Sequence, residues 1–258
     1  MSKPYNMKIY LKTLACLGMA AMMMACGNNK AKKAEAEAAE KARLDSIELA
    51  QTQQKMKEAE TLIPLLPEEP VFIVETNLGT MKIKLYSKTP KHRENFEKLA
   101  LTGFYNGLLF HRVIDGFMIQ GGDPLTRDEA AAAQYGTGGP GYTIPAEFVP
   151  EYKHKKGALA AARRGDAANP MKESSGSQFY LVQDERACAS LDGDYTVFGE
   201  TVEGLDVIDK IAKVSTNNRD LPLSPVKIVK ITLDPASQPA APEAEAERPN
   251  NDLNNPTF

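Results

Sequence analysis

Residues 110–123 read F-H-R-V-I-D-G-F-M-I-Q-G-G-D and place one arginine, Arg112, and one amide, Gln120, in a largely apolar run. The Asp115-Gly116 pair predicts a turn between two short strands. A guanidinium, an amide and large apolar side chains together suit a neutral ligand whose carbonyl must be held, rather than an ion or a phosphate. A hairpin with both polar side chains in solvent is the alternative that this segment alone leaves open.

The two-residue period of a strand decides which of these side chains share a face. Arg112 and Ile114 fall on one face before the turn, whereas Met118 and Gln120 share a face after it, with Phe117 at the bend. The pattern therefore predicts a mixed polar and apolar surface on a hairpin.

Composition excludes several classes of function. A net charge of -3 gives no sign of the basic surface that nucleic-acid binding requires. The three histidines, His92, His111 and His154, are scattered without the spacing of metal ligands, so we expect no metal centre and no cofactor. Alternation turns His111 away from Arg112 and toward the interior, which favours a packed, hydrogen-bonded histidine over a catalytic one.

The N-terminal segment 1–26 has the composition of a signal peptide. Lys8 and Lys12 precede an apolar run that is too short to span a bilayer comfortably, and the run ends in M-M-A-C with Cys26 last. This ending resembles the lipobox of bacterial lipoproteins, with Met in place of the usual Leu three residues before the cysteine. Cys26 would then carry a lipid. A plain cleaved secretory signal is the alternative.

A lipid on Cys26 would hold the protein at a membrane of the bacterial envelope. Gly27 provides no acidic retention cue, which favours the outer membrane, with the folded part in the periplasm or at the cell surface. Cys188 would have no partner cysteine if Cys26 is lipidated and Cys16 is removed with the signal, so no disulfide is expected.

Two further segments flank the folded domain, which we place at 70–234. Residues 27–69 are rich in Ala, Glu and Lys and predict a solvated helical spacer, with too broken an apolar stripe for a coiled coil. Residues 235–258 carry Pro, Ala, Glu and Asn with almost no large apolar side chains, and we expect a disordered tail.

Within 70–234 the pattern predicts short strands and two helices. A helix should open at Thr89-Pro90 and stop at Gly103, and a second lies near 203–212. The expected strands are 71–76, 80–86, 110–114, 117–121, 157–162, 177–183, 196–199 and 226–233. This content favours a mostly β barrel over a sandwich, because helices commonly cover the ends of barrels.

Four motifs in order along this domain resemble the cyclophilin peptidyl-prolyl isomerases. They are residues 110–123, G-T-G-G-P-G-Y at 136–142, S-G-S-Q-F-Y at 175–180 and L-D-G-D-Y-T-V-F-G at 191–199. The resemblance implies a closed eight-stranded antiparallel barrel capped by two α-helices, with a substrate groove on its outer face. It also implies a monomer that binds proline-containing peptides and unfolded envelope proteins.

The resemblance assigns the site residue by residue. Arg112 matches the catalytic arginine, which would donate a hydrogen bond to the nitrogen lone pair of a twisted X–Pro amide. The matching substrate-binding residues are Phe117, Met118, Gln120, Ala162, Gln178, Tyr180, Leu191 and Tyr195. For Gln178, the cap of a strand is the alternative. Arg163-Arg164 could contact acidic substrate segments, but solvated loop charges are favoured.

Three positions depart from the pattern of many family members. Tyr180 stands where Phe is usual, and Tyr195 stands where eukaryotic members have His, although bacterial relatives often have Tyr. Ser190 replaces a tryptophan that contributes to cyclosporin binding. We therefore expect an active isomerase with weak cyclosporin sensitivity. The competing hypotheses are a proline-segment binding module without turnover and a structural envelope lipoprotein.

Overall fold

The computed structural model describes residues 29–239, and the chain divides into two compact units, 1–50 and 51–258. Helix α1 (Asn29–Leu62) is the N-terminal helix that the Ala- and Glu-rich composition predicts. A short 3-10 turn, η2 (Ile63–Leu65), follows it. The predicted signal segment and Cys26 lie outside the described residues.

The last turns of α1 belong to the second unit and are not fully solvated. Ala59 is buried and Leu62 packs against the hydrophobic core, while Lys98 Nζ lies 3.2 Å from Glu60 Oε1. The expectation of a solvated spacer up to residue 69 is therefore wrong for this last part, because the helix has an apolar face that the domain covers.

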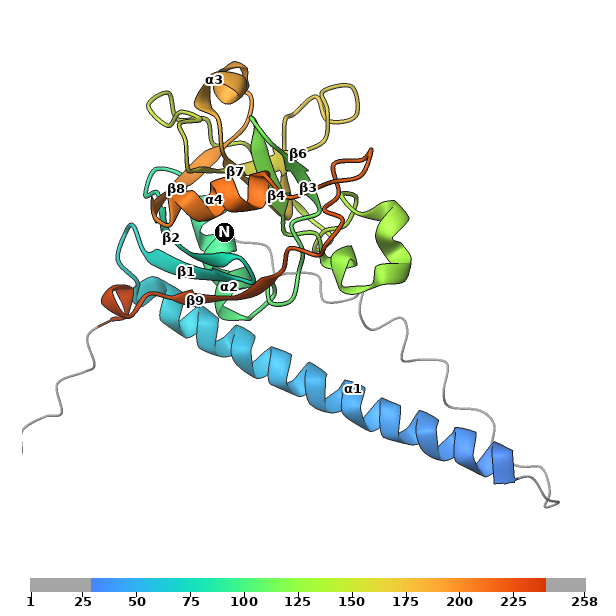
Figure 1. Ribbon diagram of the computed structural model, residues 1–258. Helices are drawn as coiled ribbons and strands as arrows, with labels where there is room; N and C mark the ends of the chain where they lie inside the picture. The colour runs from blue at the N-terminus through green and yellow to red at the C-terminus, as the bar shows by residue number, and fades with distance from the viewer. Residues whose placement is uncertain (1–28, 240–258) are drawn as a thin grey trace, which may run out of the picture. The chain divides into compact units, whose positions relative to one another are not determined.

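Antiparallel strands form one strongly curled sheet (Figure 1). The strands are β1 (Val71–Thr76), β2 (Gly79–Leu85), β3 (Arg112–Ile114), β4 (Met118–Gly121), β5 (Thr143–Ile144), β6 (Ala158–Arg163), β7 (Ser174–Val182), β8 (Val197–Glu203) and β9 (Ile228–Leu233). Eight of them follow the order β3-β4-β7-β6-β8-β2-β1-β9, and β5 pairs with β7 beside this path.

The sheet is an open, curled half-barrel, so the expected full closure of the barrel is not confirmed. Among the described residues, the end strands β3 and β9 share no continuous ladder. Instead, backbone hydrogen bonds join the segment just before β3 to the start of β9 and the residues before it, from Phe110 N–H to the Val226 carbonyl and from Ile228 N–H to the Leu108 carbonyl. The short length of β3 leaves room for a loop beside Arg112.

Two helices cover the sheet where the sequence predicts them. They are α2 (Pro90–Leu101), which begins with proline at its first position, and α4 (Leu205–Ala212). Helix α2 contacts β7 and β9, while α4 contacts β2, β3 and β4 (Figure 1). The shorter helical elements are α3 (Glu185–Cys188), η3 (Pro124–Arg127), η4 (Glu129–Gln134), η5 (Ala189–Leu191) and η6 (Pro235–Ser237).

The predicted tail begins too early at residue 235, because η6 is part of the folded domain. The Ser237 hydroxyl oxygen accepts a hydrogen bond of 2.9 Å from the Val71 N–H, and Ser237 itself is buried. The ordered domain therefore continues past residue 234, because this turn is fixed to the first strand. Residues 240–258 of the predicted tail lie outside the described part of the chain.

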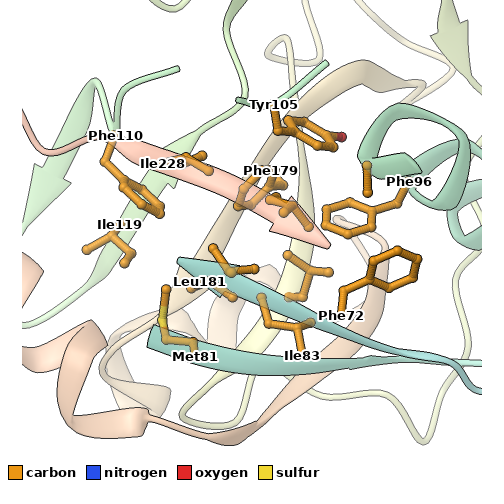
Figure 2. Packing of buried hydrophobic residues seen from close by; sticks show 14 of the residues in the cluster. Phe72, Met81, Ile83, Phe96, Tyr105, Phe110, Ile119, Phe179, Leu181 and Ile228 are labelled. Atoms are coloured by element: carbon orange, nitrogen blue, oxygen red, sulfur yellow. The ribbon is translucent and has the colours of Figure 1, made fainter. Parts of the chain in front are cut away.

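The core lies inside the curled sheet and is rich in aromatic rings (Figure 2). Phe96 of α2 meets Phe72 of β1 and Phe179 of β7 at ring-centroid distances of 5.9 and 5.8 Å, both edge to face. Such pairs stabilise a core beyond the area that they bury. Side chains thus fill the space that the curled sheet encloses.

Strand β7 is buried on both of its faces. Phe179 and Leu181 belong to the interior core, whereas Tyr180 and Val182 belong to a second apolar cluster on the other face of the same strand. Because side chains of a strand alternate, this second cluster lies on the outer surface of the barrel. It marks the face on which a site can form.

Gly122, which follows β4, makes the closest backbone approach to β7. Its φ is +87°, and a Cβ there would lie 2.3 Å from the Ser177 carbonyl oxygen. Gly116 also has a positive φ of +76°, but a Cβ there meets no atom within 4 Å. Substitutions at Gly122 and Gly116 can therefore separate the cost of a steric clash from the cost of a left-handed backbone conformation.

We expect Gly122→Ala to lower the free energy of unfolding by more than about 3 kcal/mol, because β4 must move away from β7. Gly116→Ala should cost only about 1–2 kcal/mol, the cost of a left-handed conformation with a side chain. Urea denaturation of both variants measures this difference. Equal losses of unfolding free energy would show that the clash between an added Cβ at position 122 and the Ser177 carbonyl oxygen does not determine the cost.

Candidate active site

Strand pairing places Arg112, Gln120 and Tyr180 in one row across the outer face. Arg112 of β3 is directly opposite Gln120 of β4, Gln120 is opposite Tyr180 of β7, and Tyr180 is opposite Ala160 of β6. Side chains of directly opposed residues lie on the same face of a sheet. The ladder therefore brings together a cation, an amide and an aromatic ring from distant segments.

A cluster of packed apolar side chains lies beside this row, on the same face of the sheet. Its buried members are Tyr86, Met118, Ala158, Ala160, Ala162, Tyr180, Val182, Cys188 and Val197, and its partly buried members are Ile114, Phe117, Tyr152, Leu191 and Tyr195. The structure thus places six of the eight predicted binding residues in one cluster, with Gln120 and Gln178 adjoining it. We call this cluster the proline pocket, after the ligand that the resemblance in the sequence leads us to expect there.

Gln178 fixes the orientation of Gln120. The Gln178 side-chain nitrogen donates to the carbonyls of Gly136 and Gly138 at 3.1 and 2.7 Å, and its oxygen accepts from Gln120 Nε2 at 3.0 Å. Its side chain thus connects the glycine-rich loop to β4, so it does more than cap a strand. The Gln120 amide is therefore held in one orientation on the outer face.

The glycine-rich loop is itself held by a buried carboxylate. Asp123 Oδ2 accepts hydrogen bonds from the N–H groups of Gly136 and Gly138, and Oδ1 accepts from the Leu125 N–H at 2.8 Å. The sequence pattern did not predict this role for Asp123, although Asp123 ends the run Q-G-G-D and stands directly before a proline, where an aspartate commonly caps a turn. It supports the site through the loop without contacting the pocket.

Arg112 has a partner that the sequence did not predict. Its Nε lies 3.5 Å from Asp220 Oδ2, and its side chain is 43% exposed. The Asp220 carbonyl also accepts a hydrogen bond of 2.8 Å from the Val113 N–H, which fixes this loop to β3. The guanidinium is therefore oriented at the edge of the sheet and is still accessible to a ligand.

Arg163 is not the solvated loop charge that the sequence led us to expect. Its side chain is only 4% exposed, and its guanidinium carbon lies 4.4 Å from the centroid of the Tyr195 ring. Arg163 Nε donates to the Asp194 carbonyl at 2.8 Å, and Nη1 lies 2.6 Å from Asp166 Oδ1. A cation so placed on an aromatic face holds Tyr195 at the edge of the proline pocket.

Ser190 and Cys188 both lie close to Leu191 in the chain. Ser190 in η5 is exposed beside Leu191, and the expectation of weak cyclosporin sensitivity stays a prediction. Cys188 is a free, buried thiol in the proline pocket, and burial raises its pKa to about 11. A thiol with this pKa stays protonated at neutral pH and is a poor nucleophile.

Residues 29–239 contain neither a membrane-spanning helix nor a cluster of metal-binding side chains. No helix within that range has both the length and the apolar character needed to cross a bilayer. In the same range, no three His, Cys, Asp or Glu side chains gather to hold a metal ion.

Comparison with known proteins identifies the family. A sequence model described as cyclophilin type peptidyl-prolyl cis-trans isomerase/CLD matches residues 71–233. A human peptidyl-prolyl cis-trans isomerase-like 1 is 35% identical over 164 residues, which cover 63% of this chain and 92% of that protein. The chain thus belongs to the cyclophilin-type peptidyl-prolyl isomerases, an enzyme family.

Two other similarities extend this comparison. A peptidyl-prolyl cis-trans isomerase-like 2 of Rhizopus delemar is 35% identical over 220 residues, 79% of this chain but only 38% of that longer protein. A crystal structure of a Cryptosporidium parvum cyclophilin in the presence of the dipeptide Ala-Pro has a TM-score of 0.56 and 28% identity. The match covers 64% of this chain and 98% of that one.

His111 lies next to Arg112 in sequence and lines one cavity together with Arg112 and Gln120. It is only 4% exposed, which confirms the expected packing, but among the described residues neither ring nitrogen makes a hydrogen bond of good geometry, so the expected hydrogen bonding is not confirmed. Burial lowers the pKa of His111 to about 4. The folded protein therefore favours the neutral ring, and protonation in acid opposes folding.

We expect His111→Phe to make the stability less dependent on pH. In the wild type, the contribution of neutral His111 is complete above its ordinary pKa of 6.5 and is lost as the pH falls from 6.5 toward 4. The loss amounts to about 3 kcal/mol. An adjoining cavity of about 170 Å³ leaves room for the larger ring.

Urea denaturation of both proteins between pH 8 and 4 measures this effect. The groups that the two proteins share cancel in the difference between their curves, so the difference reports His111 alone. Parallel curves would show that His111 does not titrate as a buried group.

Proposed function

We propose that this protein accelerates rotation about X–Pro bonds in proteins of the bacterial cell envelope and thereby assists their folding. The observation that carries the proposal is the row of Arg112, Gln120 and Tyr180 beside an apolar pocket on the outer face of the sheet. The crystal structure of a related protein with Ala-Pro supports a proline-containing peptide as the ligand.

Catalysis of this reaction needs neither a nucleophile nor a proton transfer. The X–Pro amide resists rotation with a barrier of about 18–20 kcal/mol, because its nitrogen lone pair is delocalised into the carbonyl. In the twisted state the lone pair is localised on nitrogen and can accept a hydrogen bond. A donor at that point stabilises the twisted amide more than the planar one, and so lowers the barrier.

The side chains of this site can divide that task. The proline ring would lie in the proline pocket between Phe117, Met118 and Leu191. Gln120, oriented by Gln178, would hold the peptide backbone that does not rotate. Arg112 would donate to the proline nitrogen from the sheet edge, where Asp220 orients its guanidinium.

We expect Arg112→Ala to lower kcat/KM for a proline peptide about 100-fold, because one hydrogen bond specific to the transition state is lost. Peptide affinity should change little, since the pocket and Gln120 are unchanged. Arg186→Ala, an exposed position on α3, is the matched control and should behave as wild type. Exchange spectroscopy by NMR gives the rate, and calorimetry gives the affinity.

The same measurement separates the competing hypotheses. A binding module without turnover would show peptide affinity but no isomerisation in either wild type or the Arg112 variant. A structural envelope protein would bind no proline peptide at all. Full activity of Arg112→Ala would contradict the assigned role of this arginine even if the protein is an isomerase.

We also propose that Cys26 is lipidated and anchors the protein to a membrane, with the outer membrane favoured. The support is the sequence alone: a basic start, a short apolar run and a small residue before the cysteine. The exposed face of helix α1 between Glu35 and Ala50 suits a solvated spacer between such an anchor and the domain.

Mass spectrometry of the mature protein from its own membranes tests this anchor. We expect an N-terminus at Cys26 that carries a diacylglyceryl group, and we expect Cys26→Ser to release the protein from the membrane fraction. An unmodified N-terminus at any other residue would contradict the anchor and favour a plain secretory signal.

A further inference from the structure

A buried chain of hydrogen bonds lies directly behind the proline pocket. Asp192 Oδ1 is 2.7 Å from His154 Nδ1, and His154 Nε2 is 2.8 Å from the Tyr180 hydroxyl. The His154 backbone N–H also donates to Asp192 Oδ1 at 2.9 Å. Tyr180 stands where the resemblance leads us to expect phenylalanine, which has no hydroxyl to join such a chain.

The chemistry of the three groups sets the direction of each hydrogen bond. An ionised carboxylate can only accept, so His154 Nδ1 must carry the hydrogen that faces Asp192. In a neutral imidazole the other nitrogen is then an acceptor, and the Tyr180 hydroxyl must donate to it. The two rings lie nearly parallel, at 10°, with centroids 5.9 Å apart.

This arrangement turns the Tyr180 hydroxyl hydrogen away from the ligand. The side chain of His154 is fully buried and Tyr180 is 4% exposed, so water does not compete for the bond. The ring of Tyr180 presents carbon to the proline pocket while its hydroxyl hydrogen is held by His154. A tyrosine can thus serve in an apolar pocket, because its polar end has a partner elsewhere.

We propose that Asp192 and His154 are positioning residues that keep the Tyr180 hydroxyl directed away from bound proline, and that protonation of His154 reverses this orientation. A protonated imidazole would present an N–H to the hydroxyl oxygen of Tyr180. The hydroxyl hydrogen would then have to point into the apolar cluster or into the pocket itself, where a proline ring offers no acceptor. Proline binding would weaken. The proposal rests on the proposed isomerase function.

The groups around His154 decide how readily its ring is protonated. Burial lowers the pKa of His154, and Asp192 and Lys153 are the charged groups that face it. Partial burial opposes ionisation of Asp192, but hydrogen bonds from His154 lower its pKa overall. The other groups that act on Tyr180 are Cys188, Tyr195 and Arg163, and burial raises the pKa of the Cys188 thiol, which stays protonated in mild acid.

The test compares the pH profile of KM in wild type and in Tyr180→Phe. In wild type, KM for a proline peptide should rise about fivefold as the pH falls from 8 to the lowest value at which the protein stays folded, the equivalent of one lost hydrogen bond, while kcat changes little. Tyr180→Phe should show a flat KM over the same range, whatever its value at pH 8, because it lacks the hydroxyl. Circular dichroism at each pH confirms that both proteins are folded.

Two outcomes would overturn the proposal: a KM profile that is flat in wild type, or one that rises equally in both proteins. A second measurement needs no variant and no activity. Nitrogen NMR of the His154 ring at pH 8 should show the neutral tautomer with hydrogen on Nδ1, and a hydrogen on Nε2 would also overturn the proposal. If wild type lacks isomerase activity at every pH, the proposed function fails, but the NMR result still decides the hydrogen-bond chain.

Discussion

The alternation of side chains along β7 is the constraint on which the rest of the structure depends. This strand must fill the interior with Phe179 and Leu181 and supply the outer face with Tyr180 and Val182. Both faces are apolar, so β7 cannot shift by one residue without exchanging core and pocket. Its neighbours β4 and β6 are held on either side in the registers that align Gln120 and Ala160 with Tyr180.

The filled interior explains why the site is on the outside. Aromatic rings from α2, β1 and β7 occupy the space that the curled sheet encloses, as Figure 2 shows. The outer face carries a pocket instead, and its walls come from strands and from the loop around Leu191. Residues on strands are held by the ladder hydrogen bonds, which gives the rigidity that a site for a twisted amide needs.

Polar side chains behind the pocket hold the residues of its walls in position. Gln178 orients Gln120, Arg163 packs on Tyr195, and His154 holds the hydroxyl of Tyr180. Each of these supporting side chains is buried or nearly so, and each is bonded to the backbone or to a carboxylate. A pocket that is apolar where the ligand binds thus depends on hydrogen bonds on its far side.

The sequence by itself determined the main strands, the two longer helices of the domain, the hairpin that carries Arg112 and Gln120, and the family. These follow from local rules: the two-residue period of strands, the proline that opens α2 and motifs that stay in order along the chain. Tertiary structure alone decided that Asp220 faces Arg112, that Arg163 is buried and that His154 meets Tyr180. Each of these contacts joins residues from separate segments, and no local pattern records the strand register and loop paths that bring them within bonding distance.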